Sequence, residues 1–275
     1  MAAIEHARTA EPIRPLAIRE VFTPHRKVIL PIILLVLLLG WWELVAQSGV
    51  VSKLVLAGPI AIVVAMISEA GPLAANTGIT VAQALIGFVI GNLAGLAVAV
   101  AFVHSDLARR TIYPLAIGAE AVPVVAVLPV LILWLGNGME PKIFITAFLT
   151  FFPMLVNAFR GLRSADAEVS ELLYTLSASP WQRLVMVRLP ASVPFLFNAL
   201  KLSACGSVVA SLVAEWLASN QGLGFLIILY GQAYKIPEVW AAAIVASAAS
   251  LAVYGAVVFA EYKLTPWLRL RQSDL

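Results

Sequence analysis

Charged side chains are scarce in this sequence. Asp, Glu, Lys and Arg make up only 12% of the 275 residues, whereas hydrophobic residues make up 61%. A soluble globular domain has roughly 25% charged and about 45–50% apolar residues. The shortage of charge excludes an ordinary soluble domain, because much of the surface must face something other than water. A helix that crosses a bilayer needs about 20 predominantly apolar residues, so this length accommodates six such helices and their connections.

Residues that support catalysis or hold metals are equally few. The single cysteine, Cys205, lies in an apolar run and cannot form an internal disulfide, so we interpret it as a small packing residue. The three histidines, His6, His25 and His104, fall outside the apolar runs. Hydrolytic or metal-assisted chemistry inside a membrane needs several such groups at one depth. The pattern therefore argues against a membrane-embedded enzyme.

A phosphate-binding loop of the form G-x-x-x-x-G-K-[ST] is absent from the sequence. Any ATP-driven process must therefore draw its energy from another polypeptide, and we expect this chain to bind no cofactor of its own. The formal charge of +3 and the pI near 9.1 could indicate nucleic-acid binding. However, basic cytoplasmic loops of a membrane protein give the same bias, and no soluble domain carries a basic stripe. We expect a lipid bilayer and no nucleic acid as partner.

Long apolar runs are what the sequence has in abundance, and they predict an all-α polytopic membrane protein with about six transmembrane helices. A shorter apolar stretch, Ser52 to Gly71, predicts a helix that lies at the outer interface. In the second run, Gly87, Gly91 and Gly95 are four residues apart, and this spacing favours close helix approach in lipid. The predicted spans are 28–46, 76–103, 111–135, 142–160, 191–217 and 238–260.

Lys and Arg gather in alternate connections between these runs. Fourteen of the 18 fall on the side of the N-terminus and three on the opposite side. Because basic residues are enriched in cytoplasmic loops, we predict a multi-pass protein of the bacterial cytoplasmic (inner) membrane with both termini in the cytoplasm. The predicted organisation is a cytoplasmic tail (1–27), a transmembrane domain (28–262) and a second cytoplasmic tail (263–275).

The longest predicted cytoplasmic connection, residues 161–190, contains an amphipathic segment. From Ala165 to Ser177, acidic residues alternate with Val and Leu at helical spacing, and a Ser-Pro step at Pro180 predicts a break before a second short helix. A helix that lies on lipid favours Lys and Arg on its polar face. Because this helix is acidic, a protein partner is favoured.

This connection resembles the cytoplasmic signature of importer permeases driven by ATP-binding-cassette subunits. The signature reads E-A-A, three residues, G, nine residues, I-x-L-P. Aligned on Leu189-Pro190, the chain places Glu171-Leu172-Leu173 on E-A-A, Ser177 on the glycine and Val187 on the isoleucine, with the spacing kept. Flanking stretches such as AVPVVAVLPVLILWLGNGMEPK and AEWLASNQGLGFLI resemble permeases of the nitrate/sulfonate/taurine type, including those for thiamine pyrimidine precursors and riboflavin.

The resemblance implies a type I importer permease fold and a set of partners. These are a second permease chain forming a homodimer, two ATPase subunits that hold ATP and Mg, and an extracytoplasmic solute-binding protein. A glycine at position 177 would permit a left-handed turn, which serine adopts only at a steric cost. The residues expected to couple to the ATPase are Glu171, Leu172, Leu173, Ser177, Ala178, Leu189 and Pro190.

The substrate is less constrained by the sequence. Glu120 and Glu215 are ionisable residues inside predicted spans, which marks them as candidates for the translocation path; structural hydrogen bonding is the alternative. Trp134 and Trp216 are further candidates, with a lipid-belt or packing role as the alternative. A tryptophan can stack on an aromatic ring and a carboxylate can accept its N–H groups, so the Glu215-Trp216 pair favours a pyrimidine precursor or similar heterocycle. Sulfonate, taurine or nitrate import, and ion-coupled secondary transport, remain alternatives.

Overall fold

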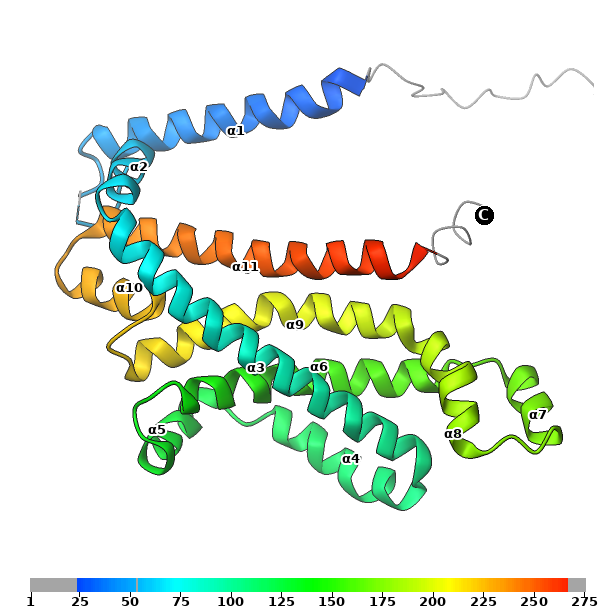
Figure 1. Cartoon of the computed structure of the whole chain (residues 1–275). Helices are drawn as coiled ribbons and strands as arrows, with labels where there is room; N and C mark the ends of the chain where they lie inside the picture. The colour runs from blue at the N-terminus through cyan, green and yellow to red at the C-terminus, as the bar shows by residue number, and fades with distance from the viewer. Residues whose placement is uncertain (1–23, 53, 267–275) are drawn as a thin grey trace, which may run out of the picture.

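The computed structural model, which describes residues 24–52 and 54–266, consists of helices joined by short loops (Figure 1). Within these residues there is no β-strand. Residues 1–23 and 267–275, which hold most of the predicted tails, lie outside the described residues. The first half contains α1 (Pro24–Gln47), α2 (Pro59–Ser68), α3 (Ala70–His104), α4 (Asp106–Glu120), α5 (Val124–Leu135) and α6 (Glu140–Arg163). The second half contains α7 (Ala167–Thr175), α8 (Pro180–Arg183), the π-helical turn η1 (Leu184–Arg188), α9 (Leu189–Ala218), α10 (Leu223–Gln232) and α11 (Ile236–Leu264).

Among the described residues, five helical segments are long and apolar enough to cross a membrane. They are provided by α1, α3, α6, α9 and α11 and confirm the all-α polytopic prediction. The short helix α2 occupies the stretch predicted for the interface, and α3 begins at Ala70, six residues before the predicted start of its span. In Figure 1 the bundle has two ends, one marked by α10 and the other by α7 and α8; we call them the α10 end and the α7 end.

The predicted third span, 111–135, is wrong as a single helix. The chain instead forms α4 and α5, separated at residues 121–123. Pro123 has no backbone N–H and disfavours helical geometry at Val122, and the amides of Ala121 and Val122 turn back to carbonyls three residues earlier. A helix of 12 residues such as α5 spans only about 18 Å. Neither α4 nor α5 is among the helices long enough to cross a membrane.

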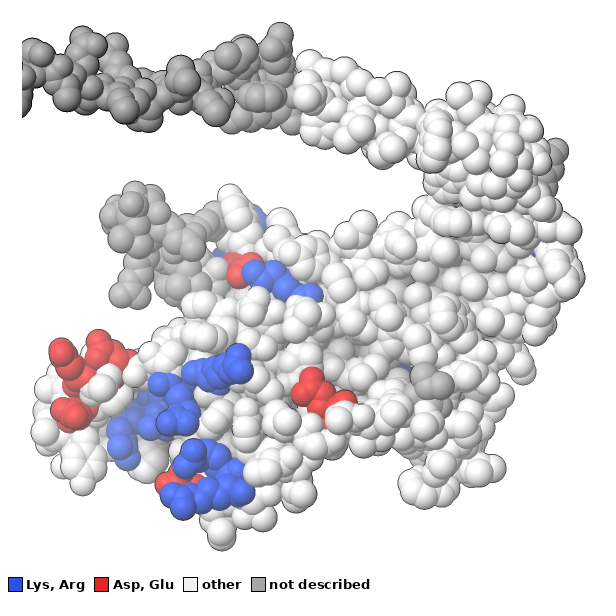
Figure 2. Space-filling view, turned by 180° about the vertical axis from the view of Figure 1, so that it is seen from behind, with Lys and Arg blue, Asp and Glu red and all other residues white. Residues whose placement is uncertain are grey.

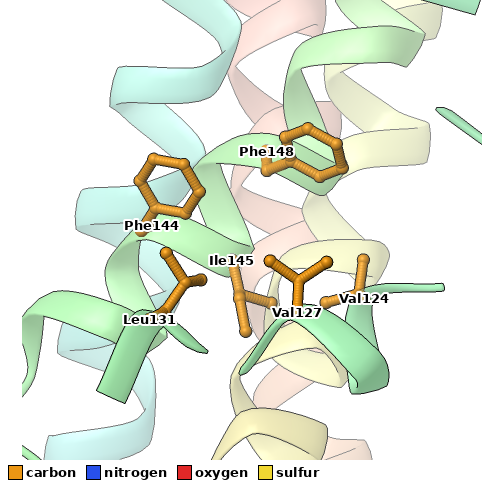
Figure 3. A pocket seen from close by; sticks show the side chains of 6 residues that line it. All are labelled: Val124, Val127, Leu131, Phe144, Ile145 and Phe148. Atoms are coloured by element: carbon orange, nitrogen blue, oxygen red, sulfur yellow. The ribbon is translucent and has the colours of Figure 1, made fainter. Parts of the chain in front are cut away.

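After this break, α5 packs against the first half of α6. Figure 3 shows Val124, Val127 and Leu131 of α5 across a small apolar pocket from α6. The α6 side of the pocket is formed by Phe144, Ile145 and Phe148. Aliphatic and aromatic contacts therefore hold α5 in place and fix where the loop between α5 and α6 lies.

Helices α3 and α6 pack closely against each other, and Gly87, Gly91 and Gly95 of α3 make this close approach possible. All three glycines are buried. A Cβ atom at Gly87 would collide with the side chain of Thr146, one at Gly91 with the backbone oxygen of Ala147, and one at Gly95 with the backbone oxygen of Phe151. The absence of side chains lets the two backbones approach, as the four-residue spacing predicts.

Helix α1 stands apart from the rest of the bundle. Its residues from Ile29 to Leu39 have exposed fractions of 40–64%, and Figure 1 shows it joined to the other helices through α2 at the α10 end. The junction is held by Glu43, whose carboxylate accepts a hydrogen bond from Ile60 N at 3.1 Å, and by edge-to-face contact of Trp42 with Trp240 at 5.3 Å.

Candidate functional site

The amphipathic helix predicted from Ala165 to Ser177 is present as α7, and hydrogen bonds define both of its ends. Asp166 caps the N-terminus by accepting a hydrogen bond from Glu168 N at 3.0 Å. At the C-terminus, Ala178 N donates to Leu173 O and Ser177 N donates to Tyr174 O. This pair of hydrogen bonds is the Schellman motif, which requires a left-handed residue at the position after the cap. Ser177 has φ +56° and supplies it, so the turn expected of glycine is kept with serine.

The second half of the connection is anchored to the bundle. Ser179 and Gln182 form a reciprocal capping box at the start of α8, with Pro180 in the first turn, as the Ser-Pro break predicts. The chain then passes through η1, where Leu184 is 1% exposed and packs in the same apolar core as Leu162 of α6. The segment therefore joins α6 and α9 rigidly at its ends.

Between these anchors, α7 has no buried residue and projects beyond the bundle (Figure 1). Leu172 is 58% and Leu176 is 68% exposed, and the acidic Glu171 next to Leu172 is also exposed. Leu173, Ala178 and Leu189 are half-buried, and Pro190 is exposed. The helix presents an acidic and apolar surface that nothing in this chain covers among its described residues.

At the α10 end, Glu215 of α9 is 1% exposed and belongs to a polar network. Its carboxylate accepts hydrogen bonds from Thr80 Oγ1 of α3 at 2.9 and 3.0 Å and from Gly224 N at 2.8 Å. Thr80 Oγ1 also accepts from Leu223 N, and Asn76 Oδ1 accepts from Gly222 N at 2.6 Å. The network satisfies the free amides at the N-terminus of α10 and places a carboxylate where the helix dipole favours negative charge.

The far side of α10 is fixed by Tyr230, which donates a hydrogen bond to Glu69 at 2.9 Å. Burial, together with this hydrogen bond, raises the pKa of Tyr230 to about 12, so its hydroxyl remains a donor at neutral pH. Helix α10 is therefore tied to α3, α9 and the α2–α3 junction by polar contacts.

A polar pocket of about 210 Å³ opens beside this network. Lys142, only 3% exposed, donates to Gly138 O at 2.8 Å and Asn137 O at 3.3 Å and lies near enough to Glu215 for electrostatic attraction. The Gln83 side-chain oxygen accepts from Ser211 at 3.1 Å. Other polar lining residues are Ser219, Asn220 and Gln221. The pocket offers amide, hydroxyl and ammonium groups to a polar solute.

The four residues expected along the path do not form one cluster. Only Glu215 is buried; Glu120 lies on the surface at the end of α4, and Trp134 and Trp216 are 78% and 47% exposed. The carboxylate of Glu215 is occupied inside the protein, whereas the adjacent Trp216 packs against Gly224 and reaches the surface.

Sequence reasoning missed Asn76, Thr80 and Gln83 of α3. A signal was present, because these polar residues recur at helical spacing in an apolar run and continue the stripe of Gly87, Gly91 and Gly95. Lys142 belongs to the stretch AVPVVAVLPVLILWLGNGMEPK that carries the family resemblance, but the sequence alone assigns it no place at the pocket.

Comparison with known proteins identifies the family. Residues 87–269 match the family described as "Binding-protein-dependent transport system inner membrane component". The formylaminopyrimidine transport permease protein ThiX of Halalkalibacterium halodurans is 28% identical over 238 residues, which cover 86% of this chain and 95% of that protein. The riboflavin transport system permease protein RibX of Chloroflexus aurantiacus is 30% identical over 241 residues, 86% of this chain and 89% of its own length. The putative aliphatic sulfonates transport permease protein SsuC of Bacillus subtilis is 30% identical over 228 residues, 82% and 83% of the two chains.

The matched region begins at Gly87 in α3 and includes α7, Glu215 and α10, whereas Asn76, Thr80 and Gln83 lie before it. The chain belongs to the binding-protein-dependent transport family: it is a multi-pass inner-membrane permease of an ATP-binding-cassette importer, with the type I importer permease fold, and a transport subunit rather than a catalytic enzyme.

Proposed function

We propose that the chain moves a small solute, delivered by an extracytoplasmic binding protein, through a homodimer of permeases driven by two ATPase subunits. In this proposal the α7 end and both termini face the cytoplasm, and ATP with Mg is held by the ATPases. The observation that carries the proposal is α7: a capped helix with no buried residue, fixed at both ends to membrane-crossing helices.

The connection at α7 can transmit movement because its anchors are tightly packed. Leu184 of η1 and Leu162 of α6 share one core. A Cβ atom at Gly161 would collide with Ser192 and Phe195 of α9, so α6 and α9 are in close contact where the coupling segment begins. Packed helices shift as units. A partner that binds α7 and moves as a rigid body would therefore tilt α6 and α9 together.

For the substrate, we propose a thiamine pyrimidine precursor or a similar heterocycle. Two of the relatives are named for formylaminopyrimidine and riboflavin. The pocket beside α10 contributes amide groups of Gln83, Asn137 and Gln221, which suit the ring nitrogens and amino groups of such a molecule. Glu215 and Glu140 lie near enough to Lys142 to attract its charge, and this attraction within the protein favours a neutral solute.

An aliphatic sulfonate is the second candidate. It is favoured by the 30% identity to a protein named for sulfonate transport and by the ammonium of Lys142 beside the pocket. An ammonium and several N–H donors would match a sulfonate group.

The test is reconstitution of the chain with its ATPase and solute-binding protein in liposomes. Uptake that requires ATP and both partners is the expected result, and uptake that persists without an ATPase would contradict the proposal. Thermal-shift measurements on the binding protein with formylaminopyrimidine, riboflavin, alkyl sulfonates and nitrate then separate the candidates. Stabilisation by sulfonates or nitrate alone would overturn the heterocycle assignment and leave the transport mechanism intact.

A further inference from the structure

Arginines gather at the α7 end of the bundle. Figure 2 shows basic side chains on this end beside the acidic ones of the coupling segment. They come from three places in the chain: the start of α4, the last turn of α6, and the α8–η1 stretch that leads into α9. We call them the arginine cluster: Arg109, Arg110, Arg160, Arg163, Arg183 and Arg188.

Aromatic packing brings the parts of the cluster together. Tyr113, one turn after Arg109, lies 5.5 Å from Phe159 of α6, measured between ring centroids. The guanidinium of Arg163 lies 5.6 Å from the centroid of the same Phe159 ring. Arg188 lies close enough to Arg163 and Arg183 for electrostatic repulsion. The arginines of α4, α6 and η1 therefore border one surface.

The positive charge of this surface is largely uncompensated within the chain. Across residues 24–52 and 54–266, the one ion pair that involves the cluster joins Arg109 to Asp106 at 3.0 Å. The Nε atom of Arg183 is buried without a hydrogen-bond partner. Like charges this close destabilise one another, and an unpaired buried N–H is unfavourable, so an anion from outside the chain would stabilise the arrangement.

The position of the cluster indicates which anion. Arg160 and Arg163 end the apolar helix α6, and Arg188 immediately precedes the apolar helix α9. Charged residues at the ends of spans lie at the depth of lipid headgroups. Guanidinium groups bind phosphate oxygens in a bidentate manner. The exposed Trp181 and Met186, 67% and 64% exposed, flank Arg183 and can rest at the same interface.

We propose that the arginine cluster is a binding site for the phosphate group of an anionic phospholipid, beside the coupling segment. The acidic surface of α7 is left for a protein partner. A lipid bound here contacts α4, α6 and η1 at once and stabilises their arrangement. These elements lie where, under the proposed function, a movement of α7 is passed to α6 and α9. The proposal depends neither on the substrate nor on which way the α7 end faces.

The test titrates the full-length purified chain with phosphatidylglycerol or phosphatidylcholine and counts bound lipid by native mass spectrometry. The variant is Arg163→Gln/Arg188→Gln. Lys263→Gln is the matched control, because Lys263 is a cation at the same end of the bundle that lies over Phe259 of its own helix. Each basic residue at an anionic surface is worth about a fivefold factor in binding. We expect the double variant to bind phosphatidylglycerol about 25-fold more weakly, with binding of phosphatidylcholine unchanged.

Equal retention of phosphatidylglycerol by the wild type, the double variant and the control would overturn the proposal. Unchanged lipid binding together with lost ATPase association would also overturn it and identify the cluster as a protein-docking surface. If the double variant does not fold, Arg163→Lys serves in its place. It keeps the charge but loses the planar, bidentate group, and it is expected to weaken binding of phosphatidylglycerol by severalfold while retaining the wild-type melting temperature in phosphatidylcholine.

Discussion

The carboxylate of Glu215 lies 2.8 Å from the backbone nitrogen of Gly224, across the turn that joins α9 to α10. The same carboxylate accepts hydrogen bonds from Thr80, which is 135 residues away in the sequence. One buried acidic side chain thus holds the start of α10 against both α3 and α9. This geometry favours a structural role for Glu215 over direct contact with a solute.

Replacing Glu215 by alanine is expected to destabilise the protein. The change leaves Gly224 N and Thr80 Oγ1 without their acceptor in a buried site, which costs about 1–3 kcal/mol for each group. We expect a lower thermal unfolding temperature and faster proteolysis of the loop at residues 219–222. The control Glu120→Ala, at an exposed glutamate, is expected to leave both unchanged. Normal stability of Glu215→Ala with loss of uptake would instead support a path role.

Gly91→Ala is expected to separate α3 from α6. The added Cβ would meet the backbone oxygen of Ala147 and the Thr150 hydroxyl, and backbone atoms cannot move aside as a flexible side chain can. Overpacking of this kind costs about 1–3 kcal/mol. Gly206→Ala is the matched control, since a Cβ at Gly206 meets nothing within 4 Å. The measurement is thermal unfolding of the two variants in the same detergent, and equal values would contradict the packing argument.

Ser177→Gly is expected to stabilise the end of α7. Ser177 has φ +56°, a left-handed conformation that costs a residue with a Cβ roughly 1 kcal/mol. In this variant, hydrogen exchange of the backbone amides at positions 177 and 178 should be about fivefold slower than in the wild type, the factor that corresponds to this energy. Ser170→Gly, in the interior of the same helix, should speed exchange because glycine weakens helices. Slower exchange in both variants would count against the left-handed strain as the cause.

Glu171→Arg is expected to abolish ATPase association while leaving the permease folded. The side chain is exposed on α7, so the substitution reverses a surface charge and disturbs no core. Co-purification with the ATPase measures the effect, and size-exclusion behaviour reports folding. Glu238→Arg, a matched charge reversal in the first turn of α11, should retain the ATPase. If the Glu171→Arg variant retained the ATPase fully, the proposal that α7 is the docking site of the ATPase would be contradicted.

Local sequence patterns account for most of the architecture. Apolar runs predict six membrane-crossing helices, because burial in lipid requires about 20 apolar residues in succession, and five of the six are long helices among the described residues. The Ser-Pro step predicts the break between α7 and α8, because proline has no backbone N–H to donate and its ring disfavours a helix that continues through it. The spacing of Gly87, Gly91 and Gly95 predicts a close helix contact without naming α6 as the neighbour. The break between α4 and α5 also has a local cause, which is Pro123. The residues around Pro123 are continuously hydrophobic, and this run predicts one unbroken helix instead.

By itself, then, the sequence determined the class of protein, the amphipathic helix α7 and the segregation of basic and acidic residues, because each depends on residues within one or two helical turns. Only the tertiary structure decided that Glu215 holds α10, that Lys142 lies beside a polar pocket, and that arginines from α4, α6 and η1 border one surface. These features join side chains tens to more than a hundred residues apart. Hydrogen bonds and charge repulsion depend on distance in space, and that distance is fixed only when the helices pack.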